Sequence, residues 1–352
     1  MTQLPAAGFL FGLLAATAAA QTSIVLPPEY ERAWGHNSSS TLGGNSTRTQ
    51  MIFAQPVAPG TTIVGFGLRQ APRVVDLAAF VAEIEIRCSS TAAAPGALSE
   101  TFANNIGSDE VVVLPRRTVI VPAAPANRST GDFAEFEFTN PFVFGTNSNP
   151  NLCIELLVYG RANGAMWSTD RGFATPDGSA RDAGIGCGPA TMSSTSTGGT
   201  YVSGATIELA LANAPPNTFA TLLPSLDQKE CGAGQLLPFP LSNYGGNPAC
   251  AVLVGPTLGP VSYLTDATGA ASHAFVVPPG IGRLGVGWQW SYLVPPTASN
   301  PLGLETTASH STWIGPEVIV PHAQYVWNLF DVGATTGDAG VDSVPVVKLV
   351  TQ

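Results

Sequence analysis

Charged side chains are scarce in this 352-residue chain, and Asp, Glu, Lys and Arg together supply only 11 % of it. The 14 Lys and Arg residues face 24 Asp and Glu residues, which gives a formal net charge of -10. A phosphate-binding surface needs clustered cations, yet the only adjacent basic pair is Arg116-Arg117. The composition therefore argues against nucleic acid as a partner.

Catalytic and zinc-binding signatures are also missing. The sequence holds no G-x-S-x-G, H-E-x-x-H or Walker motif, and no C-x-x-C pair or Cys and His spacing typical of a zinc site. The four histidines are scattered and none has a Ser or Cys context that predicts a triad: His36, His273, His310 and His322. Triads assemble in space, but these absences favour a protein that is not an enzyme.

Long apolar runs are absent as well. The stretch from Phe9 to Ala20 is too short to span a bilayer comfortably and ends in three alanines, a small-residue cleavage pattern. We predict a signal peptide over 1–20, cut before Gln21; because no Lys or Arg precedes the apolar stretch, a buried N-terminal helix is the alternative. The mature chain is then expected to be secreted, extracellular or at the cell surface, without a transmembrane segment.

Short apolar runs bounded by turn residues are what the chain does contain. Its 38 Gly and 30 Pro residues interrupt long helices. In "VAEIEIRC" every second residue is apolar, which predicts a strand with one buried face: Ala82, Ile84, Ile86 and Cys88. Glu83 and Glu85 then lie on the opposite face, where exposed charge is a simpler interpretation than an acid/base pair.

Similar patterns predict strands at 62–68, 111–114, 119–121, 133–139, 152–159, 206–212, 251–254, 272–277, 284–294 and 317–320. Many short strands with turn chemistry between them predict an all-β fold of two β-sandwich domains in tandem, jelly-roll or immunoglobulin-like. Apolar periodicity disappears in a Gly- and Asp-rich stretch, which predicts a boundary. We expect domains at 22–170 and 185–315, a linker at 171–184 and a C-terminal β-hairpin extension at 316–352.

Aromatic and acidic residues supply the candidate binding sites. The strand 284–294 carries Trp288, Trp290 and Tyr292 on one face, either as a buried core stripe, which we favour, or as a platform for sugar rings. Trp34 and Trp167 lie outside strong strands and are the candidates for exposed, ligand-binding aromatics. No cofactor is expected apart from structural Ca²⁺, for which the acidic loops supply these candidate ligands: Asp109, Asp170, Asp177, Asp182, Asp331, Asp338 and Asp342. Their spacing matches no calcium-binding motif, so solvated loop charge is favoured.

Five cysteines in an exported protein predict disulfides, with at least one thiol left over. By position, Cys88 pairs with Cys153, while Cys250 pairs with either Cys187 or Cys231. The stretch 98–113, "LSETFANNIGSDEVVV", raises a further question, because its polar residues could form a site. Its Asn and Gly residues are turn formers, so we interpret it first as a turn that delivers the strand at Val111 and is held down by Leu98 and Phe102.

Several stretches resemble an uncharacterised family of secreted bacterial proteins with two β-sandwich domains. The resemblance rests on "IVGFGLR", "EIEIRCSS", "PGALSETFANNIGSDEVVV" and "NPNLCIELLVYG" in the first half and on "GIGCGPA", "NPACAVLVGP" and "WQWSYLVPPTASNPLGL" in the second. It implies a disulfide between Cys187 and Cys250 that leaves Cys231 unpaired. Cys153 replaces an aliphatic residue of the family pattern, which supports a local bridge to Cys88. The family contributes no catalytic or ligand residue.

The leading hypothesis is an exported, non-catalytic β-protein with a structural, surface-associated or glycan-binding role, with glycans or cell-envelope components as partners. The alternative is a secreted hydrolase of polysaccharide or peptide that uses carboxylates brought together from separate loops, with Asp109 and Asp170 as the residues to change.

Overall fold

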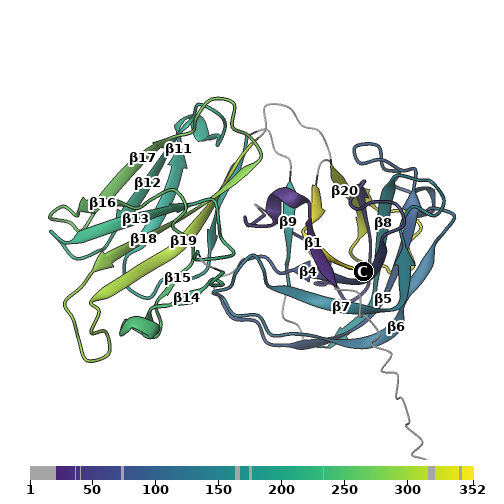
Figure 1. Cartoon of the computed structure of the whole chain (residues 1–352), viewed down its shortest axis with the longest axis horizontal. Helices are drawn as coiled ribbons and strands as arrows, with labels where there is room; N and C mark the ends of the chain where they lie inside the picture. Colours follow the sequence, from purple (N-terminus) through teal and green to yellow (C-terminus); the bar gives the residue numbers. More distant parts are fainter. Residues whose placement is uncertain are drawn as a thin grey trace, which may run out of the picture.

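The computed structural model is all-β and describes residues 21–35, 37–39, 41–72, 75–162, 167–173, 177–232, 234–315, 322–340 and 343–352. The predicted signal peptide, Asp342, His36 and the strand predicted at 317–320 lie outside the described residues. Figure 1 shows two groups of sheets side by side. Each group encloses its own hydrophobic core, and we call the two groups the first and the second sandwich.

The first sandwich packs two large antiparallel sheets face to face. The six-stranded sheet has the order β21 (Asp338–Ala339), β20 (Ala323–Asn328), β3 (Thr47–Ala54), β8 (Asn151–Ala162), β5 (Phe80–Thr91) and β6 (Val111–Val121). The four-stranded sheet has the order β1 (Thr22–Leu26), β23 (Val347–Thr351), β4 (Thr62–Arg69) and β7 (Phe133–Val143). A three-stranded sheet adds β2 (Asn37–Ser39), β9 (Thr169–Phe173) and β22 (Ser343–Pro345). Ile84 from one large sheet and Phe66 from the other are both fully buried in the shared core.

The described strands of the second sandwich lie within residues 179–314. Its five-stranded sheet has the order β10 (Ser179–Ala183), β19 (Leu304–Ile314), β18 (Leu284–Leu293), β13 (Phe219–Ser225) and β16 (Val261–Leu264). The smaller sheets are β11 (Thr191–Ser196), β12 (Thr206–Ala212) and β17 (Ala271–Val276), and the pair β14 (Phe239–Pro240) and β15 (Ala251–Val252). Four 3-10 turns complete the described elements: η1 (Pro28–Tyr30), η2 (Phe102–Asn105), η3 (Thr197–Gly199) and η4 (Leu241–Tyr244).

The alternating patterns place side chains as predicted. In β5 the apolar positions Ala82, Ile84, Ile86 and Cys88 are at most 1 % exposed. Glu83 on the opposite face forms a bidentate contact with Arg116 at 2.9 Å. The aromatic stripe of β18 is a core stripe, because Trp288 and Trp290 are fully buried against β12 and β13. The sugar-platform interpretation of this stripe is therefore wrong.

The C-terminal segment contributes strands to all three sheets of the first sandwich. β20 pairs with β21 over two residue pairs, as a short hairpin, and its other edge pairs with β3. β22 pairs with β9, and β23 lies between β1 and β4. The Gly- and Asp-rich stretch at the predicted boundary forms β9, which belongs to the first sandwich, and β10, which belongs to the second.

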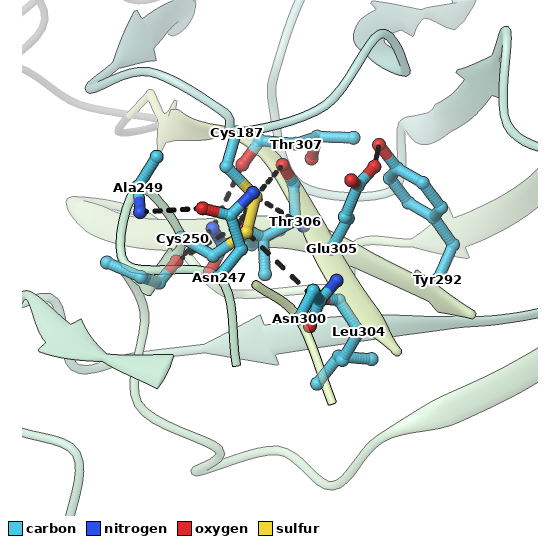
Figure 2. Close-up of a disulfide and its surroundings, with 12 residues drawn as sticks. Cys187, Asn247, Ala249, Cys250, Tyr292, Asn300, Leu304, Glu305, Thr306 and Thr307 are labelled. Carbon is cyan, nitrogen blue, oxygen red and sulfur yellow. Dashed lines mark hydrogen bonds between the residues drawn. A yellow bond between two sulfur atoms is a disulfide. The ribbon is translucent and has the colours of Figure 1, made fainter. Parts of the chain in front are cut away.

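The predicted disulfide between Cys187 and Cys250 is confirmed, and the predicted disulfide between Cys88 and Cys153 is wrong. Cys187 and Cys250 form a disulfide across 63 residues, whereas Cys88, Cys153 and Cys231 are free. Figure 2 shows the disulfide beside β19, where the Cys187 backbone N–H donates to the Thr306 carbonyl at 3.0 Å. In the register of β5 and β8, Cys88 opposes Ile154 and Ser89 opposes Cys153. A register offset of one residue points the two thiols to opposite faces of the sheet, which prevents a bridge.

Candidate functional site

A concave site lies at the edge of the six-stranded sheet, where β20 turns back into β21. Its cavity of about 330 Å³ is lined by Glu100, Trp327, Asn328, Leu329, Phe330, Thr336, Gly337 and Asp338. We call it the Trp327 pocket. Two aromatic rings, two carboxylates and one amide therefore share one opening, although Glu100 is more than 200 residues away from the others in sequence.

The loop that carries the pocket is anchored to the stretch 98–113. Thr101 and Thr336 form an isolated bridge, the Gly337 N–H donates to the Glu100 carbonyl at 2.9 Å, and the Phe102 N–H donates to the Thr335 carbonyl at 3.1 Å. Phe102 is fully buried, as predicted. A Cβ atom at Gly337 would lie 2.8 Å from the Phe102 ring and 2.5 Å from a backbone oxygen, so this close approach requires glycine.

The loop is also fixed from within. The Asn328 carboxamide oxygen accepts from the N–H groups of Phe330 and Asp331, each at 3.0 Å. Asp331 in turn accepts from the Gly333 N–H at 2.8 Å, so this calcium candidate caps its own turn. Arg48 lies 4.5 Å above the Phe102 ring and donates to the Ala334 carbonyl at 2.8 Å. Phe330 is nevertheless 91 % exposed, which makes it an apolar side chain held in water by an ordered loop.

The two tryptophans predicted to be exposed are buried, so that prediction is wrong. Trp34 is 3 % exposed and lies 5.3 Å from the Arg69 guanidinium, whereas Trp167 is 2 % exposed in the first core. Both lie in segments without strand periodicity, so no sequence pattern indicated their burial. Trp34 packs on the Arg69 guanidinium and Trp167 packs in the first core, and both contacts are made with residues distant in sequence. Trp327, which precedes the polar loop "NLFDVG", is the pocket aromatic that the sequence pattern did not reveal.

Asp170 lies in a buried ion network between the sandwiches. Arg69 donates to one carboxylate oxygen from Nε at 2.9 Å and from Nη2 at 2.8 Å, and the Gly35 N–H donates to the same oxygen at 2.9 Å. Arg181, from β10 of the second sandwich, contacts the other oxygen at 3.3 Å. Arg69 and Asp170 are both fully buried, and burial lowers the pKa of Arg69. The guanidinium groups of Arg69 and Arg181 surround this calcium candidate, and their positive charges would repel a cation at Asp170.

The remaining acidic candidates are dispersed. Asp109 accepts from the Ser90 N–H at 2.7 Å and from the Thr146 hydroxyl at 3.0 Å, which secures the turn before β6. Asp177 is exposed, Asp182 contacts His310, and Asp338 lines the Trp327 pocket. Across the described part of the chain, no three His, Cys, Asp or Glu side chains are grouped to hold a metal ion.

A chain of hydrogen bonds links Ser194, His310 and Asp182. Ser194 Oγ lies 3.2 Å from His310 Nδ1, and His310 Nε2 lies 2.7 Å from Asp182 Oδ1. His310 is 8 % exposed, and burial lowers its pKa against the opposing effect of Asp182. Ser194 points from β11 toward β19 and does not line the Trp327 pocket. The contacts therefore join the two sheets at their edge.

The stability of the second sandwich is expected to fall on acidification because of His310. Its folded-state pKa lies below that of the unfolded chain, about 6.5, so the folded protein binds this proton less tightly. The stabilisation is complete above pH 6.5 and is lost as the pH falls through the folded-state pKa. Urea unfolding between pH 5 and 8 measures the slope, which His310→Gln should flatten. An identical slope in the variant would contradict this assignment.

The comparisons with known proteins identify no relative. No family model and no curated protein matches the chain. Two solved structures with some similarity are the cryo-EM structures of the T=1 and T=3 Penaeus vannamei nodavirus, each 11 % identical. They cover 84 % and 89 % of this chain and 97 % and 96 % of their own, with TM-scores of 0.15 and 0.13. In the described residues no helix is long and apolar enough to cross a membrane.

Proposed function

We propose that the protein is an exported, non-catalytic β-protein that binds glycans through the Trp327 pocket. The observation that supports this proposal is the grouping of Trp327 and Phe330 with Glu100, Asn328 and Asp338 in one open cavity. Sugar rings present C–H faces that pack on aromatic rings. Their hydroxyl groups donate to carboxylate oxygens, which Glu100 and Asp338 supply in this pocket. The volume of about 330 Å³ lies within the range of small-molecule sites.

The loop order supports recognition over a merely structural role. Asn328 and Asp331 satisfy backbone N–H groups inside the loop, so little conformational freedom remains to be lost on binding. Phe330 is 91 % exposed, so the faces of its ring are open to a ligand. Its neighbour Trp327 is half-buried and stacks on Tyr325 at 4.3 Å, which fixes the ring at the wall of the pocket.

Phe330→Ala is expected to weaken binding to a polysaccharide about tenfold, which corresponds to about 1.4 kcal/mol. The reason is the loss of the exposed ring face, with no core contact removed. Affinity electrophoresis against a panel of neutral and charged polysaccharides identifies the ligand, and calorimetry with an oligosaccharide from it measures the effect. Phe219→Ala is the matched control, because Phe219 is also exposed, at 63 %, but lies on β13 of the second sandwich.

Two outcomes would overturn the proposal. One is the absence of binding to every polysaccharide and to the surface of the cells that make the protein, which would leave a structural role. The other is binding that Phe219→Ala weakens and Phe330→Ala does not. Trp327→Ala provides a second variant in the same pocket for comparison.

A hydrolase is the second candidate function, because Glu100 and Asp338 line the same cavity. Paired carboxylates in one cleft are the machinery of glycoside hydrolysis. These are not the acids suggested by the sequence, since Asp109 and Asp170 are held by backbone, hydroxyl and guanidinium groups elsewhere. Release of reducing ends from a bound polysaccharide, lost in Glu100→Gln and in Asp338→Asn, would favour this function over binding alone.

A further inference from the structure

The Trp327 pocket carries two acidic side chains and no basic one. Glu100 and Asp338 both line it and both are exposed, so a ligand in the pocket can reach them. No Lys, Arg or His is among its described lining residues. Neither carboxylate forms an ion pair with a basic side chain in the described part of the chain. A ligand therefore meets two carboxylates that no described cation neutralises.

The strand register brings aromatic rings to these carboxylates. Trp327 and Asp338 are direct partners in the antiparallel pairing of β20 and β21. Their side chains therefore leave the same face of the hairpin, with Cβ atoms about 5 Å apart. The Glu100 carbonyl accepts from the Gly337 N–H at 2.9 Å, which holds Glu100 beside the same hairpin. Phe330 also lines the pocket and is 91 % exposed. Carboxylates and aromatic rings thus border one opening.

The free hydrogen-bonding groups of the pocket are mainly acceptors. The Asn328 carboxamide is used within the loop, since its oxygen accepts from two backbone N–H groups and its nitrogen donates to the Thr336 carbonyl at 3.4 Å. The carboxylates of Glu100 and Asp338 accept and do not donate. An ammonium group has three N–H donors and no acceptor, which complements such a pocket.

A protonated amine suits these groups better than a neutral or an anionic substituent. Hydrogen bonds between an ammonium group and a carboxylate are about twice as strong as those between neutral partners. The face of an aromatic ring also attracts a cation that lies within about 6 Å of its centre. The same two carboxylates would repel a uronate or a sulfated sugar. The charge of the pocket therefore selects a cationic ligand.

We infer that the Trp327 pocket binds an amino sugar whose free amine is protonated, such as a glucosamine unit of a de-N-acetylated polysaccharide. The ammonium group donates to Glu100 and Asp338, and the C–H face of the sugar packs on Phe330. This inference rests on the glycan-binding function proposed above and specifies the charge of the glycan.

Calorimetry of the full chain with three β-1,4-linked oligosaccharides of equal length tests the inference. Oligomers of glucosamine, N-acetylglucosamine and glucose carry an amine, an acetamide and a hydroxyl group at the same ring carbon. The measurement is made at about pH 6, where an amine with a pKa of about 7.7 is largely protonated. The glucosamine oligomer is expected to bind about tenfold more tightly than either of the others. Added salt should reduce this preference, because it screens exposed charges.

The double variant Glu100→Gln and Asp338→Asn removes both charges while it keeps the acceptor oxygens and nearly the same side-chain size. The ratio of the glucosamine to the glucose affinity should fall from about ten to about two or less. Glu137→Gln is the matched control, because Glu137 on β7 is exposed and does not line the pocket. The control should keep the ratio of the unmodified protein. Urea unfolding of each variant verifies that it is folded.

The outcomes separate this inference from the proposed function. Equal affinity for the glucosamine and glucose oligomers would overturn the inference and leave glycan binding in place, as would binding to other glycans without binding to the glucosamine oligomer. A preference for glucosamine that persists in the double variant would also overturn the inference, because the amine would then be recognised outside this pocket. The absence of binding to every glycan would overturn both proposals.

Discussion

Asp170→Asn is expected to lower the free energy of unfolding by about 3–5 kcal/mol, the usual cost of removing one partner from a buried ion pair. The variant keeps the size of the side chain but removes the negative charge opposite Arg69 and Arg181. Arg69 is fully buried and cannot reach solvent, so its charge would remain uncompensated. Carbonyl groups of Tyr30, Ala33 and Thr130 accept from Arg69, but none of them carries a charge. Urea titration followed by tryptophan fluorescence measures the change.

The matched control removes a carboxylate from an exposed pair. Glu135 contacts Lys348 at 2.7 Å, and the Glu135 side chain is 49 % exposed. Glu135→Gln should therefore cost less than about 1 kcal/mol, because water replaces the lost partner. If Asp170→Asn were no more destabilising than Glu135→Gln, the buried network would not be the strong link between β4, β9 and β10 that its geometry indicates.

Loss of the Cys187–Cys250 disulfide is expected to be the second large effect. The bridge closes a loop of 63 residues, and the chain-entropy relation assigns about 4 kcal/mol to a loop of that length. The double variant Cys187→Ser and Cys250→Ser should therefore unfold at a lower urea concentration than the oxidised protein. The expected reduction in the free energy of unfolding is about 2–4 kcal/mol.

Cys231→Ser separates the disulfide from a general effect of cysteine replacement. Cys231 is half-buried and free, so its replacement should change stability by no more than about 0.5 kcal/mol. Reductant should destabilise the unmodified protein and leave the double variant unchanged. A reductant effect of equal size in the double variant would contradict the assignment.

The sequence predicted those strands whose apolar residues alternate. β5 was found because apolar and polar residues alternate in the first part of its sequence. β18 was found because aromatic and aliphatic residues occupy every second position, although six consecutive residues of this strand are buried. β12 was found with both of its ends. β10 and β11 have the sequences "SARDA" and "TMSSTS", in which apolar residues do not alternate. These two strands form because they pair with β19 and β12. Strands of this kind are defined by partners that are distant in sequence.

The candidate sites show the same division. Glu100 belongs to a stretch that the sequence singled out, but its pocket exists only because residues 328–337 fold back onto that stretch. Asp170 looked like loop charge, yet its role depends on Arg69 and Arg181, which no local pattern connects. The predicted disulfide between Cys88 and Cys153 is wrong because the register of β5 and β8 places the two cysteines one residue out of alignment. The register between two strands cannot be deduced from the spacing of residues along the chain.

The pairing of β1 with β23 has a consequence for how the protein forms during synthesis. Thr22 lies opposite Thr351, so the four-stranded sheet of the first sandwich is incomplete until nearly the whole chain has been made. The described strands of the second sandwich lie between Ser179 and Ile314 and pair with one another. The middle of the chain can therefore reach its final pairing before either flank does. Until the C-terminal part of the chain has been synthesised, β3 lacks its partner β20 and β4 lacks its partner β23. The backbone N–H and C=O groups at these strand edges remain unpaired during that time.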